Sequence, residues 1–286
     1  MRFSVTMVAT GGDSWGIVDV ATAVEERGLD GLWLPDHTHI PVSRASRYPP
    51  GGELPDRYRR NLEPITALAM AAAVTQRIRL GTGILLAAQR DPIVSAKALA
   101  TLDDQSGGRL AVGVGSGWNV EEMRDHGVDP QTRWARTADH VRAMRALWED
   151  DVAEHVGEHV RFAPSWSWPK PHQRPLPVLV GGAPTERTFA HIAELGQGWI
   201  PMGGRGLSEA VRRLRGVVAA SGRDPAGLEV VPFIRVPDDP GTVLALRAAG
   251  ATEVGFEVHP GDAASVRAAL DRVAVVAAEA STIRSG

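Results

Sequence analysis

The sequence contains no cysteine among its 286 residues. Without a thiol the chain can form no disulfide, no thiolate metal site and no cysteine nucleophile, and its redox compartment stays open. It also lacks a run of about 18 apolar residues, the minimum for a transmembrane helix. The first residues show neither the long apolar core nor the small-residue cleavage site of a signal peptide. We therefore expect a first strand there and a cytoplasmic protein.

An excess of basic residues is also missing, because the formal net charge is only -3. A protein that coats nucleic acid usually has a basic patch and a high isoelectric point. The composition, 43% hydrophobic and 23% charged, is typical of a globular chain that buries a sizeable core. We expect a small-molecule enzyme that binds neither nucleic acid nor a membrane.

Short apolar, β-branched runs alternate with helical patterns along the whole chain. This alternation indicates parallel β-α-β units, and eight of them predict a single (β/α)8 TIM barrel over residues 1–286. The competing architecture is an open doubly wound sheet, which is disfavoured because no GxGxxG turn follows the first strand. Two proline-rich segments, 38–60 after the second strand and 151–176 before the fifth, are expected to be irregular insertions.

The expected element boundaries follow from this pattern. Strands are expected at residues 3–8, 31–34, 78–86, 109–114, 177–180, 198–202, 228–234 and 253–258. Helices are expected from Ile17, capped by Asp13 or Ser14, and at residues 63–74, 92–103, 119–148 with a break near 129–130, 185–195, 207–220, 244–249 and 263–280.

The carboxyl end of the second strand carries the plainest polar feature of the sequence. Active sites of TIM barrels lie at the carboxyl ends of the strands, and here Asp36, His37 and His39 follow the strand. Histidine titrates near neutral pH, so His37 beside a carboxylate can donate or accept a proton. The pair can also be purely structural. The His-x-His spacing fits a metal site as well, but the fifth and sixth strands end in Gly-Gly and Pro-Met, so we expect no metal.

Glycines gather after the third, fourth and fifth expected strands. A glycine lets a flat or charged ligand approach the backbone closely. The segment Gly181 to Thr185 leads from a strand into a helix, where free N–H groups suit a phosphate. Each of these features also occurs as a simple tight turn or as packing of a strand on a helix. Other residues are candidates for the substrate pocket: Trp15, His39, Trp118 and Trp199.

Three stretches together resemble the luciferase-like monooxygenase family, and more closely its branch that uses the deazaflavin coenzyme F420. They are GLDGLWLPDH (28–37), RIRLGTGILLAAQRDPIVSAKALATLDDQSGGRLAVGVGSGWNVEE (77–122) and PVLVGGAPTERTFAHIAELGQGWIP (177–201). Their order and spacing agree along the chain from the second strand to the sixth.

The resemblance implies a (β/α)8 barrel that is often dimeric, with roles for particular residues. It places Asp36 and His37 near the redox face of the ring. It implies a non-prolyl cis peptide at Gly83-Ile84 that backs the ring. The loops after the fourth and fifth strands would meet the ring, the phosphate and the side chain of the cofactor. The implied cofactor-binding residues are Asp36, Gly83, Ile84, Gly115, Ser116, Asn119, Val180, Gly181, Gly182, Ala183 and Thr185.

Two positions depart from the sugar-phosphate dehydrogenases of this branch. Trp118 stands where those enzymes have a glutamate acid, and the place of a family tryptophan is occupied near Pro41. Both changes disfavour a sugar-phosphate substrate and predict a more apolar pocket. They also leave His37 as the one evident proton-handling group, with Asp36 expected to orient it.

Three functions remain open from the sequence. The first is an oxidoreductase that transfers a hydride between coenzyme F420 and a small organic substrate. The second is an FMN-dependent monooxygenase of the same fold, and the third is a non-catalytic flavin-binding barrel. The cofactor distinguishes the first two, because a deazaflavin does not readily activate oxygen.

Overall fold

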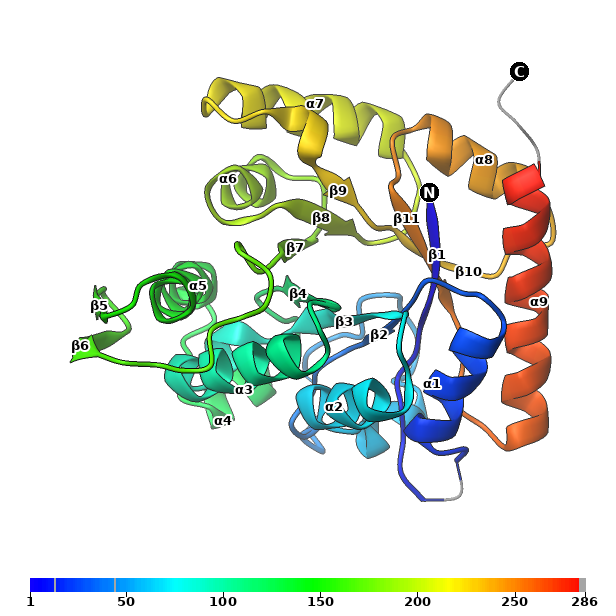
Figure 1. Ribbon diagram of the computed structural model, residues 1–286, viewed down its shortest axis with the longest axis horizontal. Coiled ribbons are helices and arrows are strands. Elements are labelled where there is room, and N and C mark those ends of the chain that lie inside the picture. Colours follow the sequence, from blue (N-terminus) through cyan, green and yellow to red (C-terminus); the bar gives the residue numbers. More distant parts are fainter. Residues whose placement is uncertain (13, 44, 283–286) are drawn as a thin grey trace.

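The computed structural model describes residues 1–12, 14–43 and 45–282, and nine of their strands form one curled parallel sheet with helices packed around it (Figure 1). The sheet order is β10-β11-β1-β2-β3-β4-β7-β8-β9. Its strands are β1 (Arg2–Thr6), β2 (Gly31–Leu34), β3 (Arg79–Leu85), β4 (Leu110–Val114), β7 (Val178–Gly182), β8 (Gly198–Pro201), β9 (Glu229–Val230), β10 (Phe233–Arg235) and β11 (Glu253–Glu257).

The helices lie between these strands in the sequence. They are α1 (Ile17–Glu26), α2 (Pro64–Val74), α3 (Pro92–Gln105), α4 (Val120–Asp125), α5 (Arg133–Glu149), α6 (Glu186–Leu195), α7 (Leu207–Ala220), α8 (Gly241–Ala248) and α9 (Ala263–Thr282). None of the helices in the described ranges is both long and apolar enough to cross a membrane. Asp13, an expected cap of α1, lies outside the described residues, and the N-cap of α1 is Gly16.

The two strands at the ends of the sheet order, β9 and β10, are neighbours in the sequence. The sequence predicts one strand over 228–234, but the structure breaks it at Val231 and Pro232. Proline has no N–H for the ladder, so it interrupts the strand here. The Val231 N–H still donates to the Trp199 carbonyl at 2.9 Å, and Gly255 N–H donates to the Pro232 carbonyl at 3.0 Å. The sheet therefore curls back on itself.

Residues 151–176 are predicted from the sequence to be irregular, but part of this segment is regular. They contain an antiparallel hairpin of β5 (Ala153–Val156) and β6 (Arg161–Ser165), at the left edge of Figure 1. The carboxylate of Asp139, on α5, accepts hydrogen bonds from the His159 and Val160 N–H groups and lies 2.8 Å from His155 Nε2. This long-range anchor has no local sequence signal. The described part of 38–60 is irregular except for a 3-10 helix, Asp56–Arg60.

The core has two layers. The larger lies between the sheet and the helices, and the smaller fills the inside of the curled sheet around Trp33 and Ile200. At the amino ends of the strands, Glu253 is fully buried beside Arg2 and Arg79. The opposite edge, where the strands end, carries the polar residues predicted for the site.

Local sequence signals set the helices that flank this edge. Pro64 and Pro92 begin α2 and α3, where a missing N–H costs nothing. The Asp91 carboxylate caps α3 by accepting a hydrogen bond from the Val94 N–H at 2.9 Å. The two prolines and the Asp91 cap fix the residues at which α2 and α3 begin, close to the carboxyl ends of the strands.

Candidate active site

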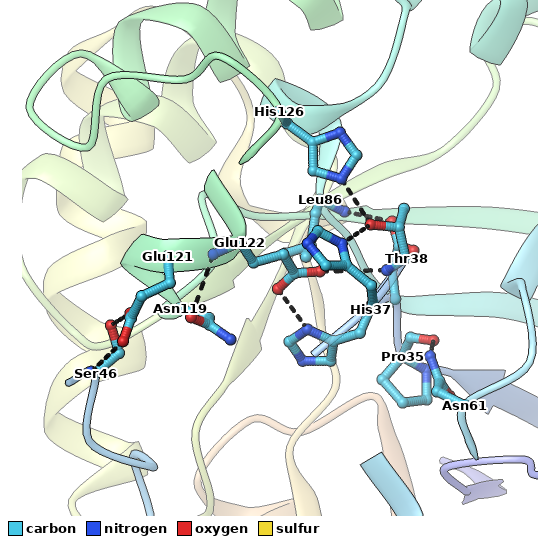
Figure 2. Close-up of polar contacts among 12 residues, drawn as sticks. Pro35, His37, Thr38, Ser46, Asn61, Leu86, Asn119, Glu121, Glu122 and His126 are labelled. Carbon is cyan, nitrogen blue, oxygen red and sulfur yellow. Dashed lines mark hydrogen bonds and ion pairs between the residues drawn. The ribbon is translucent and has the colours of Figure 1, made fainter. Parts of the chain in front are cut away.

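His37 is paired with a buried carboxylate that the sequence analysis did not single out. Its Nδ1 lies 2.8 Å from Glu122 Oε2, and Glu122 is fully buried (Figure 2). The other Glu122 oxygen accepts a hydrogen bond from the Thr38 N–H at 3.2 Å. A carboxylate oxygen only accepts hydrogen bonds, so Nδ1 is the nitrogen that donates to Glu122 and Nε2 is free of this pair.

Asp36 points to a different partner and does not orient His37 as predicted. Its carboxylate accepts two hydrogen bonds from Arg90, at 2.7 and 2.6 Å, and one from the Leu86 N–H at 2.9 Å. Such a bidentate pair is rigid and charge-compensated. Asp36 therefore ties the end of β2 to the segment after β3.

Aromatic rings from two segments surround His37. The Tyr58 ring lies 5.6 Å from the imidazole and the Trp118 ring 5.7 Å from it, both edge to face. Tyr48 contacts both of these rings, and its hydroxyl is 3.2 Å from the Tyr58 hydroxyl. These are the chain's two tyrosines, and both come from the segment 38–60. The predicted pocket residue Trp118 is thus brought beside His37, and the segment 38–60 forms the opposite wall.

The Gly83-Ile84 peptide bond is cis, as the resemblance implied. Both residues remain half-exposed at the end of β3. The neighbouring glycines leave room for the Ile84 side chain rather than for a ligand on the backbone. A methyl group placed on Gly115 would lie 2.1 Å from Ile84 Cδ1, and one on Gly181 would lie 2.6 Å from Ile84 Cγ2. Gly115 and Gly181 therefore make room for the Ile84 side chain. Together with Gly83, this side chain forms a half-exposed apolar surface, the Gly83-Ile84 ledge.

Asn119 lies at the start of α4, where its side-chain oxygen faces the Glu122 N–H at 3.4 Å. Its amide nitrogen, Nδ2, is buried and has no partner among the described residues. Figure 2 shows this nitrogen turned toward the His37 side of the site. A buried donor without a partner is costly in a folded protein. It is therefore suited to a ligand atom, and nearby Ser116 is buried at the end of β4.

His39 is exposed on the solvent side of the His37–Glu122 pair and does not lie in a pocket. Its Nε2 is 3.0 Å from Asp125, and Thr38 Oγ1 is 2.6 Å from His126 Nε2. The two imidazole rings lie 5.5 Å apart. Among the residues that the structure describes, no group of three or more metal-ligating side chains is placed to hold an ion.

The turn between β7 and α6 lies where the sequence predicts an anion site. β7 ends at Gly182, and the Thr185 hydroxyl caps α6 by accepting a hydrogen bond from the Thr188 N–H at 3.2 Å. Ala183 and Thr185 are exposed. Val180, by contrast, packs its side chain into the core between the sheet and the helices.

Two tryptophans predicted for the pocket lie elsewhere. Trp199 is buried in the core, edge to face with Phe189 of α6, and its Nε1 donates to the Gly182 carbonyl at 2.9 Å. Trp15 packs near α1, with the Arg267 guanidinium of α9 over its ring at 4.9 Å. A tryptophan next to a strand end has no local signal that separates core from pocket.

Comparison with known proteins places this geometry in a family. Residues 2–237 match the sequence model of the luciferase-like monooxygenases. The chain belongs to the luciferase-like monooxygenase family. An uncharacterised protein of Mycobacterium tuberculosis (strain ATCC 25618 / H37Rv) is 43% identical over 265 residues, 91% of this chain and 93% of that protein.

Relatives with named activities are more distant. The F420-dependent glucose-6-phosphate dehydrogenase of Kineococcus radiotolerans is 30% identical over 238 residues, 80% of this chain and 66% of the dehydrogenase. A monooxygenase from Streptomyces bottropensis has the same fold, with a TM-score of 0.81 at 20% identity and coverage of 98% of this chain and 99% of its own. An F420-dependent secondary alcohol dehydrogenase has a TM-score of 0.76 at 16% identity, with the same coverage. The two structures show that the chain shares the fold of luciferase-like enzymes.

Sequence reasoning missed Glu122 and the two tyrosines. Glu122 stands three residues after Asn119, a spacing that already has a local explanation as a helix-capping pattern. Its burial beside His37 follows only from the way α4 packs against the end of β2. Tyr48 and Tyr58 lie in a segment that the sequence predicts to be irregular. Both of the chain's tyrosines fall in this one segment, a signal that could have marked it as part of the site.

Proposed function

We propose that this protein is an F420-dependent oxidoreductase that transfers a hydride between the deazaflavin and a small organic substrate. When bound, the deazaflavin supplies or accepts the hydride, and the protein supplies position and electrostatics. One observation carries the proposal: the buried His37–Glu122 pair lies at the same strand edge as the half-exposed Gly83-Ile84 ledge. The F420-dependent names of distant relatives support the choice of cofactor.

His37 is the proposed catalytic residue, and Glu122 is its positioning residue. Glu122 holds the imidazole through Nδ1, so Nε2 gives a proton to the substrate oxygen or carbon when the hydride arrives, or takes it in the reverse direction. The carboxylate of Glu122 attracts the positive charge that develops on the imidazole during this proton transfer. The buried location of the carboxylate strengthens this interaction because water does not screen it.

Other residues fit the cofactor on the observations above. The ledge of Gly83 and Ile84 offers a flat apolar surface to one face of a ring, supported by Gly115 and Gly181. The orphaned Asn119 amide would donate a hydrogen bond to a ring acceptor. The exposed turn at Ala183 and Thr185, with Gly182 before it and the first N–H groups of α6 after it, would meet a phosphate.

We also propose the finer architecture that the sequence suggests. In a (β/α)8 barrel, β9 and β10 would together be one strand interrupted at Pro232. A homodimer is our proposal for the assembly, because Met70 of α2 and Val94 of α3 leave 47% and 66% of their surface exposed. Neighbouring apolar residues that are exposed in a single chain often mark an interface. Light scattering of the purified protein tests this part.

The cofactor proposal is tested by titrating purified protein with coenzyme F420 and with FMN, each oxidised and reduced, followed by fluorescence. We expect binding of the deazaflavin and weaker or no binding of FMN. Tight FMN binding without deazaflavin binding would refute the proposal in favour of a monooxygenase. His37→Gln separates an enzyme from a non-catalytic flavin-binding barrel. If the variant binds the cofactor as the wild type does but loses turnover of a substrate, the protein is an enzyme that uses His37.

A further inference from the structure

A cleft opens at the carboxyl ends of β10 and β11, next to the start of α9, and the chemistry proposed above makes no use of it. Its volume is about 340 Å3, and its walls include Arg235, Glu257, His259 and Arg272. In the sheet order β10-β11-β1-β2, β11 stands two places from the strand that leads to His37. Strands are spaced by about 4.8 Å, so the cleft and the imidazole are separated by about 10 Å along the rim.

The charged groups of this cleft are not used in holding the fold. Within the part of the chain that the structure describes, the side chains of Arg235, Glu257 and His259 make no hydrogen bond or ion pair. Arg272 differs, since it lies 3.4 Å from Asp238. A cleft that keeps an arginine and a carboxylate without protein partners offers both to a ligand.

Arg57 acts on His259 of the cleft from outside its walls, and the neighbouring Tyr58 contacts His37. The Arg57 guanidinium lies 5.6 Å from the Tyr58 ring centre, and the same ring contacts His37 at 5.6 Å. Burial, Arg57 and Arg235 lower the pKa of His259, and Glu257 opposes them in part. The imidazole of His259 can donate or accept a hydrogen bond to a ligand in the cleft.

The charges then decide which anion the cleft favours. Among the walls, Arg235 contributes one positive and Glu257 one negative charge, and Arg272 is compensated by Asp238. Arg57 lies outside the walls but close enough to act on His259, and it adds one positive charge, which leaves a single positive charge. A carboxylate matches this charge and also fits the planar fork of an arginine in a bidentate pair. A phosphate dianion would bring a second negative charge next to Glu257 without compensation.

We propose that this cleft is the subsite for the carboxylate of an organic-acid substrate whose reacting carbon lies beside His37. Tyr58, whose ring contacts His37 and lies under the Arg57 guanidinium, gives the body of such a substrate an apolar wall. A separation of about 10 Å along the rim suits an acid with a short carbon chain or one ring between its ends. The assignment of this ligand as a substrate rests on the proposed oxidoreductase function.

The test uses the full-length protein and 3-phenylpropanoate as probe, with the neutral 3-phenylpropanamide and inorganic phosphate as comparisons, by calorimetry or NMR titration. We expect the carboxylate to bind more tightly than the amide or phosphate. Arg235→Gln should weaken it by about tenfold or more, the loss expected for a hydrogen bond to a charged group. Glu257→Gln should improve phosphate binding. Arg267→Gln is the matched control, because Arg267 is an exposed arginine of α9 whose guanidinium lies over the ring of Trp15. This variant should bind the carboxylate and phosphate as the wild type does.

Equal binding of acid and amide, or an Arg235→Gln variant that binds the acid as wild type does, would overturn the subsite. Circular dichroism confirms that each variant is folded, which is expected because Arg235 and Glu257 are exposed. Titration of the wild-type protein with coenzyme F420 and with FMN, beside the carboxylate titration, separates the two proposals. If the cofactor binds but the carboxylate does not, only the subsite fails. If the carboxylate binds as expected and neither F420 nor FMN does, the oxidoreductase proposal fails and the anion site stands.

Discussion

Two fully buried glutamates at opposite ends of the sheet show how the same side chain is put to different uses. Glu253, at the amino ends of the strands, accepts hydrogen bonds from Arg2 and Arg79, each at 2.8 Å, and from Ser4 and Trp33. Glu122, at the carboxyl ends, pairs with His37. Arginine is always charged, whereas histidine gains and loses its proton near neutral pH.

The difference lies in whether the compensating charge is permanent. At the amino ends, two arginines and Glu229 close the ion-pair cluster with Glu253, and no member exchanges protons at neutral pH. At the carboxyl ends, the proton on His37 decides whether Glu122 faces a positive charge. The first arrangement pairs a carboxylate with permanent charges, and the second pairs one with a side chain that can handle a proton, which is the use proposed above.

The largest expected effect is on stability, from Glu253→Gln. The substitution leaves Arg79, which is mostly buried, without part of its compensation, so the free energy of unfolding should fall by about 3 kcal/mol. Urea denaturation measures this change. Glu257→Gln, at the exposed end of the same strand, is the control and should stay within about 0.5 kcal/mol. If Glu253→Gln lowers the free energy of unfolding by less than about 0.5 kcal/mol, the ion-pair cluster adds nothing to stability.

The same carboxylate predicts how stability depends on pH. Burial alone would raise the pKa of Glu253, but Arg79, Arg2 and hydrogen bonds from Ser4 and Trp33 outweigh it, and the pKa lies below the ordinary value of 4.5. A lowered pKa contributes stability that is complete above the unfolded value and is lost as the pH falls through the folded value. The difference between wild type and Glu253→Gln should thus be constant from pH 7 to about pH 5 and shrink below it. A difference that grows on acidification would contradict this assignment.

At the other end of the sheet, Glu122→Gln should affect activity more than stability. Glutamine keeps the shape but removes the negative charge beside the imidazole of His37. We expect kcat to fall by about a hundredfold once a substrate is known, within the range for a lost acid-base contribution. The loss should appear in kcat while cofactor binding stays as in the wild type. A purely structural role would instead weaken cofactor binding along with turnover.

The sequence predicted the fold better than it predicted these partnerships. Alternating apolar and helical segments locate the strands, because burial in a parallel sheet leaves a local pattern. The hydrogen bond between His37 and Glu122 joins residues 85 apart, and the one between Asp36 and Arg90 joins residues 54 apart. Nothing local distinguishes which carboxylate meets which base. For the same reason the neighbouring Asp36 was the natural but wrong partner for His37.

Asp36→Asn separates these two neighbours. Losing the bidentate pair with Arg90 should lower the free energy of unfolding by about 2 kcal/mol, because the buried amide no longer compensates the guanidinium. If Asp36 acts only through the fold, kcat should change little even if cofactor binding weakens. A fall in kcat as large as in Glu122→Gln would instead make Asp36 part of the proton-handling group.

The smallest expected effect comes from Glu121, the neighbour of Glu122, which tests how far the segment 38–60 depends on one contact. Its carboxylate accepts hydrogen bonds from the Ser46 hydroxyl and from the Ser46 N–H, the latter at 2.9 Å (Figure 2). The Ser46 hydroxyl, more than any other contact, lowers the pKa of Glu121 to about 2. The contribution is therefore present above the ordinary value of 4.5 and lost as the pH falls toward 2.

This contact is close to solvent, so Glu121→Gln should cost at most about 1 kcal/mol of unfolding free energy. Its clearer consequence should be faster proteolysis within 38–60 at neutral pH, because the Ser46 anchor of the wall that carries Tyr48 and Tyr58 is weakened. Glu149→Gln, an exposed glutamate at the end of α5, is the control. Unchanged proteolysis would mean that the aromatic contacts with Trp118 and His37 hold the segment without Glu121. In that case the wall beside the buried Glu122 would owe its position to ring packing alone.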